Sequence, residues 1–255
     1  MRTALRGRPV LSACALAGAA LALVSTALAP AAAASGNPHR PEHPANQAEL
    51  NLPMELRDRG LYVRKAQARL EWLGYPIDWR ERLEGVFGDS TQNAVWNVQN
   101  KFFLPETGVL NKETWKQIDK VAGDVGKLPK ECLSEGRVLC IDKTSKLLRY
   151  VKNKEVVLAL DVRFGVQGLE TPTGTYRVYY KWRDATSSLS SPPAPMPFAL
   201  FFNGDIAVHY SPPFAANGYY PGGGSHGCVN VRDRDKMEWL FDQFPQGGLV
   251  HVYWG

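Results

Sequence analysis

Apolar residues recur at helix spacing through the first half of the chain. One run stops at Gly74, and two later runs follow residues suited to helix N-caps, Asp89 and Asn111. A loop with Gly85 and Gly88 separates the first two runs. The spaced positions are Val63, Ala66, Leu70 and Leu73, then Ala94, Val95, Val98 and Phe102, then Trp115 and Ile118. Residues 50–121 are therefore predicted to form a small three-helix bundle.

The hydrophobic period changes after a polar connector over residues 122–136. Runs of β-branched and aromatic residues then alternate with turn residues, as is typical of strands. Prolines at 192, 193, 195 and 197 interrupt the pattern before it resumes. The predicted strands are 137–141, 147–151, 156–164, 175–182, 198–202, 206–209 and 249–253.

One helix is expected in this second half. Met237, Leu240, Phe241 and Phe244 share one helical face, and Asp233 is a candidate N-cap. The predicted fold class is α+β and multidomain. The three-helix bundle precedes a mainly β, sandwich-like domain of mixed sheets over residues 137–255, with one helix after the loop that carries Cys228.

The first 34 residues have the layout of a secretory signal peptide. Three arginines precede an apolar run over residues 10–29, and alanines at 31–34 suit a cleavage site. A retained membrane anchor is the alternative, since about 20 apolar residues span a bilayer. Residues 35–49 are rich in proline and polar side chains, which predicts a flexible linker. We expect a secreted protein with no stable membrane insertion after cleavage.

Charge says little about partners. Of the formal net charge of +5, three positive charges lie in the predicted signal peptide, which has no acidic residue, so about +2 is left. A nucleic-acid-binding protein needs a concentrated basic face or stripe, and the pattern shows none. Nucleic acid is therefore not an expected partner.

Three cysteines follow the predicted cleavage site. Cys132 and Cys140 flank a predicted turn, and an exported protein can keep disulfides. We predict that they pair, which leaves Cys228 as a free thiol. Pairing of either one with Cys228 is the competing interpretation.

The sequence around Cys228 is the most informative for chemistry. It reads Pro-Gly-Gly-Gly-Ser-His-Gly-Cys-Val-Asn over residues 221–230. Glycines let a substrate approach the main chain, and amides near Gly227 could hold an oxyanion. A thiol becomes a useful nucleophile beside an imidazole. The sequence therefore indicates a cysteine nucleophile in an acyl-transfer site.

Two histidines could act as the general base. His209 ends a predicted strand, which can aim an imidazole at a neighbouring loop, whereas His226 shares the backbone of the Cys228 loop. Reach and orientation decide this role first, so His209 is favoured. His226 is expected to shape the loop or contact substrate, or only to stabilise the turn.

Other interpretations of the cluster are weaker. The glycines lack the Gly-Lys-Ser/Thr sequence of a phosphate-binding loop. A zinc site could combine Cys228 with three histidines (His209, His226 and His251), but the spacing matches no common zinc pattern. A buried, inert cysteine fits poorly with flanking glycines. No metal or organic cofactor is expected.

Two parts of the chain resemble known families. His209, followed after 15 residues by Ser225-His226-Gly227-Cys228-Val229-Asn230, is similar to the signature of the YkuD-type L,D-transpeptidase catalytic domain, and the likeness runs from about Arg137 to Trp254. The first helical segment resembles the peptidoglycan-binding helical module. The stretches that carry this second resemblance are Val63–Leu70, Leu73–Tyr75, Gly85–Thr91 and Ala94–Gln99.

The resemblance implies a mechanism and a partner. Cys228, activated by His209, would attack a tetrapeptide stem of peptidoglycan, release D-alanine, and pass the acyl group to a diamino-acid amine on a second stem. Gly227 would help hold the oxyanion, and Ser225, His226 and Asn230 would shape the loop or contact substrate. Carbapenem-type β-lactams would be covalent inhibitors of such a wall-associated enzyme.

Rival functions remain open at this point. The same acyl-enzyme could be given to water, as in an L,D-carboxypeptidase, or to a protein amine, as in a protein-to-wall ligase. Papain-like endopeptidases are disfavoured because their cysteine precedes the histidine. A non-catalytic wall-binding protein is the rival from another class.

Overall fold

The computed structural model describes residues 52–122, 128–189 and 192–255. The predicted signal peptide (1–34), the linker (35–49) and residues 123–127 of the connector fall outside these ranges. Within them, no helix combines the length and the apolar content needed to cross a membrane.

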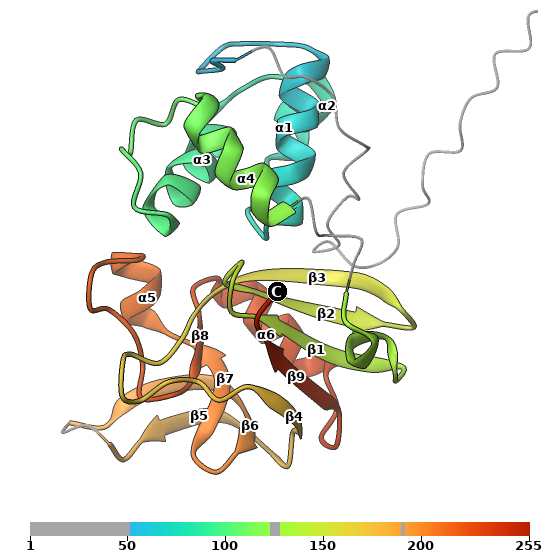
Figure 1. The fold of residues 1–255 in the computed structure, drawn as a ribbon, viewed down its shortest axis with the longest axis vertical. Coiled ribbons are helices and arrows are strands. Elements are labelled where there is room, and N and C mark those ends of the chain that lie inside the picture. The colour runs from blue at the N-terminus through green and yellow to red at the C-terminus, as the bar shows by residue number, and fades with distance from the viewer. Residues whose placement is uncertain (1–51, 123–127, 190–191) are drawn as a thin grey trace, which may run out of the picture. The chain divides into compact units, whose positions relative to one another are not determined.

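Residues 52–122 are helical, as predicted, but hold four helices (Figure 1). They are α1 (Leu61–Trp72), α2 (Trp79–Glu84), α3 (Asp89–Lys101) and α4 (Lys112–Ala122). The added α2 has no buried residue, so it leaves no apolar period in the sequence. Most of the predicted core positions are buried, among them Val63, Ala66, Leu70, Val95, Val98 and Ile118.

The predicted caps of these helices have different outcomes. Asn111 caps α4, because its Oδ1 accepts a hydrogen bond from the Thr114 amide at 2.9 Å. The prediction for Asp89 was wrong, since Gly88 is the N-cap residue of α3 and Asp89 is the first helical residue. Glu81 of α2 takes over the capping and accepts from the amides of Gly88, Ser90 and Thr91 at 3.2, 2.8 and 3.0 Å.

The second half is built on one mixed sheet, ordered β4-β9-β1-β2-β3-β8-β7-β6-β5. The pairs β1–β9 and β7–β8 are parallel, and the other neighbours are antiparallel. The strands are β1 (Arg137–Asp142), β2 (Leu147–Lys152), β3 (Glu155–Arg163), β4 (Gly174–Arg177), β5 (Tyr180–Ser187), β6 (Ala194–Asn203), β7 (Ile206–Tyr210), β8 (Val229–Val231) and β9 (Leu249–Tyr253).

The strand predictions need two corrections. The run predicted at 175–182 divides into β4 and β5, which pair with β9 and β6 near opposite ends of the strand order. The prolines at 195 and 197 do not interrupt β6, because that part of the strand pairs only with β5, and pairing with β7 begins at Leu200. A strand edge without a partner tolerates the missing amide of proline.

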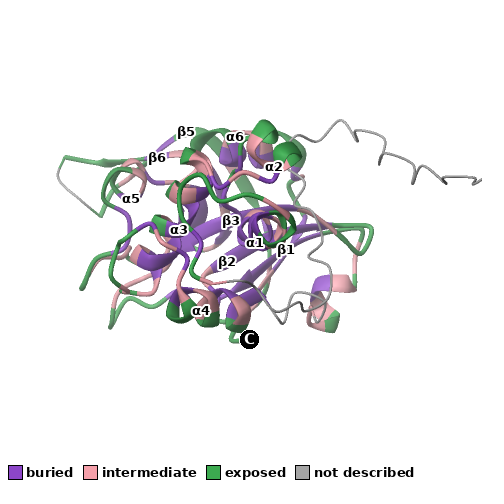
Figure 2. Cartoon of the chain, turned by 90° about the horizontal axis from the view of Figure 1, so that it is seen from above, coloured by how far each residue is buried: buried purple, intermediate pink, exposed green. Residues whose placement is uncertain are grey.

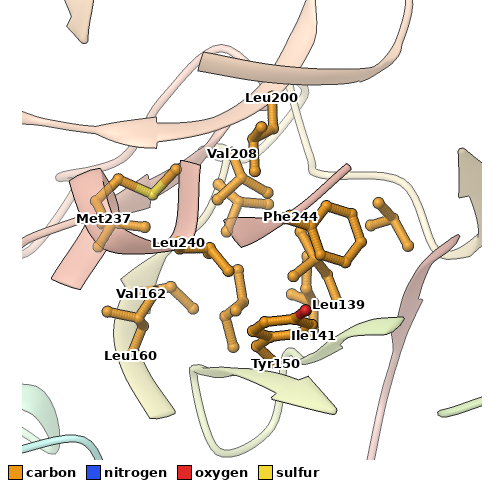
Figure 3. Packing of buried hydrophobic residues seen from close by; sticks show 14 of the residues in the cluster. Leu139, Ile141, Tyr150, Leu160, Val162, Leu200, Val208, Met237, Leu240 and Phe244 are labelled. Carbon is orange, nitrogen blue, oxygen red and sulfur yellow. The ribbon is translucent and has the colours of Figure 1, made fainter. Parts of the chain in front are cut away.

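The sheet encloses a core together with α6 (Arg234–Gln243). Asp233 caps this predicted helix by accepting from the Lys236 amide at 3.0 Å. Figure 3 shows Met237, Leu240 and Phe244 beside Tyr150 and the core residues of other strands. Figure 2 shows the same burial at the level of the strands, with β2 and β3 largely in the colour of buried residues. The sandwich-like, mainly β domain is therefore confirmed.

Two further helical segments were not predicted. They are a short helix, α5 (Pro212–Asn217), and a 3₁₀ helix, η1 (Lys130–Leu133). Cys132 of η1 forms the predicted disulfide with Cys140 of β1, with their Cα atoms 5.5 Å apart. Cys228 is the free cysteine of the described residues.

Asp161 of β3 is a buried carboxylate that gathers partners from both halves of the chain. It accepts from Lys101 Nζ at 2.7 Å, from the hydroxyl of Tyr219 at 2.8 Å, and from the hydroxyl of Tyr75 at 3.3 Å. Arg232 lies 3.4 Å away. Burial is the main reason that the pKa of Tyr75 and of Tyr219 is raised, and it lowers the pKa of Lys101.

Replacing Asp161 with alanine should destabilise the protein strongly. The variant leaves the Lys101 ammonium buried without its carboxylate, and breaking a buried pair costs about 3–5 kcal/mol. The free energy of unfolding in urea measures the loss. Asp184→Ala is the control, because this exposed carboxylate should change stability by less than about 0.5 kcal/mol. Equal effects of the two substitutions would contradict the prediction.

Candidate active site

The proposed nucleophile and base are brought together by the parallel pairing of β7 and β8. Val208 lies opposite Val229, and His209 lies opposite Asn230. Paired residues of neighbouring strands point to the same face, and successive residues alternate between faces. Because Val208 and Val229 belong to the hydrophobic core, His209 and Asn230 point to the other face. Cys228, two residues before Asn230, lies on that face diagonal to His209.

His209 is oriented by its own strand. Its Nδ1 lies 2.7 Å from the carbonyl oxygen of Tyr210. A carbonyl oxygen only accepts hydrogen bonds, so Nδ1 carries the hydrogen and the neutral ring has its lone pair on Nε2. Burial lowers the pKa of His209 to about 4, although the Tyr210 carbonyl and the Asn230 side chain oppose the shift. The ring is therefore neutral near pH 7 and able to accept a proton.

Cys228 is half-buried and lies beside Ala207 of β7. The Ala207 amide lies 3.5 Å from Sγ, and the Asp205 carbonyl oxygen lies 3.7 Å from it. Burial raises the pKa of the thiol, and the Ala207 amide partly opposes this effect. With His209 neutral, the resting pair is a thiol and an imidazole. If His209 acts as the base, it would then take the proton during attack rather than beforehand.

The loop before Cys228 is held by side-chain hydroxyls. Ser225 Oγ donates to the Cys228 carbonyl at 2.6 Å. Thr171 Oγ1 donates to the Gly227 carbonyl at 2.8 Å and accepts from the Gly165 amide at 3.1 Å. Gly227 has φ of +107°, which a side chain would resist. These contacts fix the peptide units that follow Gly227 and Cys228, and with them the direction of the Cys228 and Val229 amides.

Thr171 is a site residue that the sequence pattern alone did not identify. It lies 56 positions before Gly227 and is almost fully buried. Its motif, Thr-Pro-Thr-Gly over residues 171–174, was visible in the sequence. The pairing of this hydroxyl with the Gly227 carbonyl was not visible, because nothing local links the two segments.

The other candidate residues fall in different places. Asn230 is buried beside His209, whereas His226 is exposed on the loop. His251 lies on β9, where its Nδ1 is 2.8 Å from Thr175 Oγ1. The residues that the structure describes contain no group of three or more His, Cys, Asp or Glu side chains arranged to hold a metal.

Two family models match the sequence. The YkuD L,D-transpeptidase catalytic domain covers residues 136–252, and the peptidoglycan-binding domain covers residues 59–118. The chain thus carries a YkuD L,D-transpeptidase catalytic domain. A peptidoglycan-binding domain lies N-terminal to it. This pair of domains implies association with the cell wall.

A solved L,D-transpeptidase shares the fold. The structure from Stackebrandtia nassauensis is 23% identical and matches 79% of this chain and 97% of that chain, with a TM-score of 0.51. The structure from Xylanimonas cellulosilytica is 28% identical over 82% of this chain and 100% of that chain, with a TM-score of 0.49. An L,D-transpeptidase solved in complex with imipenem is 22% identical over 46% and 59%, with a TM-score of 0.40. A search of curated proteins gave no match.

Replacing Thr171 with valine should loosen the nucleophile loop of the L,D-transpeptidase domain. The change leaves the Gly227 carbonyl and the Gly165 amide without this partner, at a cost of about 1–3 kcal/mol. Urea unfolding measures the stability, and alkylation of Cys228 by iodoacetamide reports on the loop. Thr173→Val is the matched control, because Thr173 is exposed. A Thr171 variant as stable as this control would refute the assigned role.

His209 should make stability depend on pH below neutrality. Its pKa is about 4 in the folded protein and about 6.5 in an unfolded chain, so the unfolded state binds more protons between these values. The contribution of the neutral His209 to the free energy of unfolding is complete above pH 6.5 and is lost as the pH falls toward 4. From pH 7 to 4.5, wild type should lose roughly 2–3 kcal/mol more unfolding free energy than His209→Gln. Parallel losses in urea titrations of the two proteins would contradict this.

Proposed function

We propose that this protein is a peptidoglycan L,D-transpeptidase that cross-links stem peptides through a cysteine acyl-enzyme. The observation that carries the proposal is the position of Cys228, directly before β8 and beside Ala207, on the face of the paired strands β7 and β8 that bears His209. The hydrogen bond from His209 Nδ1 to Tyr210 supports the role of Nε2 as general base. The catalytic domain and the peptidoglycan-binding domain are consistent with a substrate in the wall.

The first half-reaction would acylate Cys228. His209 Nε2 takes the thiol proton as Sγ attacks the carbonyl carbon that follows the L-centre of the donor's diamino acid. The amides near Gly227 and Cys228 would stabilise the oxyanion, as preorganised donors do in acyl transfer. When the tetrahedral intermediate collapses, the imidazolium gives its proton to the amine of D-alanine, which leaves. A thioester to Cys228 is the product.

The second half-reaction would form the cross-link. The side-chain amine of a diamino acid on a second stem attacks the thioester and loses a proton to His209. Collapse returns the sulfur as the leaving group, and the proton restores the Cys228 thiol. A new amide joins the two stems, and no cofactor enters the balance. Ser225, His226 and Asn230 would shape this site or contact the stems.

The remaining parts of the chain fit this role in our proposal. Residues 1–34 would direct export, residues 35–49 would act as a spacer, and the domain over residues 50–121 would bind the wall. Residues 122–136 would connect it to the catalytic domain over residues 137–255. The protein would then act outside the cytoplasm, where its substrate lies.

A carbapenem tests the nucleophile directly. Attack of Cys228 on the strained lactam carbonyl opens the ring and leaves a thioester, so mass spectrometry of the intact mature protein should show the added mass of one whole carbapenem. Cys228→Ala should show none, and His209→Gln should acylate roughly 100-fold more slowly, within the range for general-base catalysis. Release of D-alanine from tetrapeptide stems should follow the same order.

The products identify the acceptor. Cross-linked dimers from tetrapeptide stems support the transpeptidase. A tripeptide without dimers would instead show hydrolysis, which is the L,D-carboxypeptidase alternative. If wild type forms no adduct and releases no D-alanine, the acyl-enzyme proposal is wrong and a non-catalytic wall-binding role is favoured.

A further inference from the structure

Arg163 stands in the same row of side chains as the proposed base. It is the last residue of β3 and lies opposite Asn230 of β8, which in turn lies opposite His209 of β7. Residues opposite each other in paired strands share a face, so these three side chains point to one side of the sheet. Cys228 lies on that side, two residues before Asn230.

The guanidinium of Arg163 is buried without a counter-ion. Its side chain is 5% exposed, and it forms no ion pair with any residue that the structure describes. Nη1 donates one long hydrogen bond, 3.4 Å, to the carbonyl of Gly218, and Nε is buried without a partner. Arginine keeps its charge at every physiological pH, so this site holds a desolvated cation with an unused donor.

The neighbouring acid cannot neutralise this charge. Asp161, two residues earlier on β3, is held by Lys101 at 2.7 Å and by Arg232 at 3.4 Å. The cations around this part of the sheet therefore outnumber their buried carboxylate. Aromatic rings compensate in part, because the Arg163 guanidinium lies 4.8 Å from the Phe214 ring and 5.4 Å from the Tyr220 ring.

From this geometry we propose that Arg163 binds a carboxylate of one of the two donor residues that the scissile bond joins. The inference rests on the proposed function, because it assigns part of the substrate to that same site. A carboxylate forms bidentate, charge-assisted hydrogen bonds with a guanidinium. These bonds are stronger than the hydrogen bond to the Gly218 carbonyl that they would replace. It would enter past Tyr220, which is exposed, in the segment between β7 and the nucleophile loop.

Two carboxylates of the donor belong to the residues that the scissile bond joins. One belongs to the terminal D-alanine that leaves, and the other belongs to the diamino acid next to it. Synthetic tetrapeptide donors that carry a carboxamide in place of one or the other separate these sources. The amide has the same shape without the charge, so only the contact with Arg163 changes.

The experiment compares KM and kcat for D-alanine release from the acid and the two amide donors. For wild type, amidation of the carboxylate that Arg163 holds should raise KM about tenfold or more with little change in kcat, while the other amide has little effect. Arg163→Gln should raise KM for the acid by a similar factor and abolish the difference between acid and amide. Arg163→Lys should restore part of the difference in KM between the acid and amide donors.

Arg232→Gln is the matched control. Arg232 lies 5.5 Å from the same Phe214 ring but is paired with Asp161. Its loss should therefore lower the stability of the protein and leave the ratio of the KM values for the acid and amide donors unchanged. Alkylation of Cys228 by neutral iodoacetamide should proceed at the wild-type rate in Arg163→Gln. This result separates recognition from damage to the nucleophile.

The wild-type protein alone can overturn the inference. If neither amide changes KM by more than about twofold, Arg163 binds neither of these carboxylates and the inference fails, whether or not its variants fold. The inference would also be overturned if the ratio of the KM values for the acid and amide donors were equal in wild type and Arg163→Gln. If wild type turns over no donor at all, the proposed function itself fails, which is a distinguishable result.

Discussion

The parallel pairing of β7 with β8 is the constraint on which the site depends. Its register, with Val208 opposite Val229, places two valines in the core and sends His209, Cys228 and Asn230 to the other face. A shift by one residue would exchange these faces and bury the polar side chains in the core. The same valines that stabilise the sheet therefore fix the positions of the proposed base and nucleophile.

Burial shapes the chemistry of this face. It lowers the pKa of His209 to about 4 and raises the pKa of Cys228, so both groups are uncharged before substrate binds. A pre-formed thiolate would be more reactive toward any electrophile. A neutral pair would form its nucleophile only as the proton moves. The hydrogen bond to Tyr210 supplies the orientation that such a transfer needs.

Charge on the same side of the sheet is distributed unevenly. Asp161 satisfies Lys101 and Arg232, while Arg163 remains buried against the rings of Phe214 and Tyr220. An unpaired buried cation is costly to a fold, so its place in the row of His209 and Asn230 is chemically informative. Anionic stem peptides would complete the electrostatics that the chain alone leaves unbalanced.

The sequence by itself determined the features that depend on local pattern. The runs of apolar residues located α1, α3, α4, α6 and most strands, and the spacing of the cysteines predicted the Cys132–Cys140 disulfide. Only the tertiary structure decided the cap of α3 by Glu81, the tolerance of β6 for proline, the anchoring of Gly227 by Thr171, and the isolation of Arg163. Each of these depends on which distant segments pair, because hydrogen bonds and desolvation act through space and leave no period in the chain.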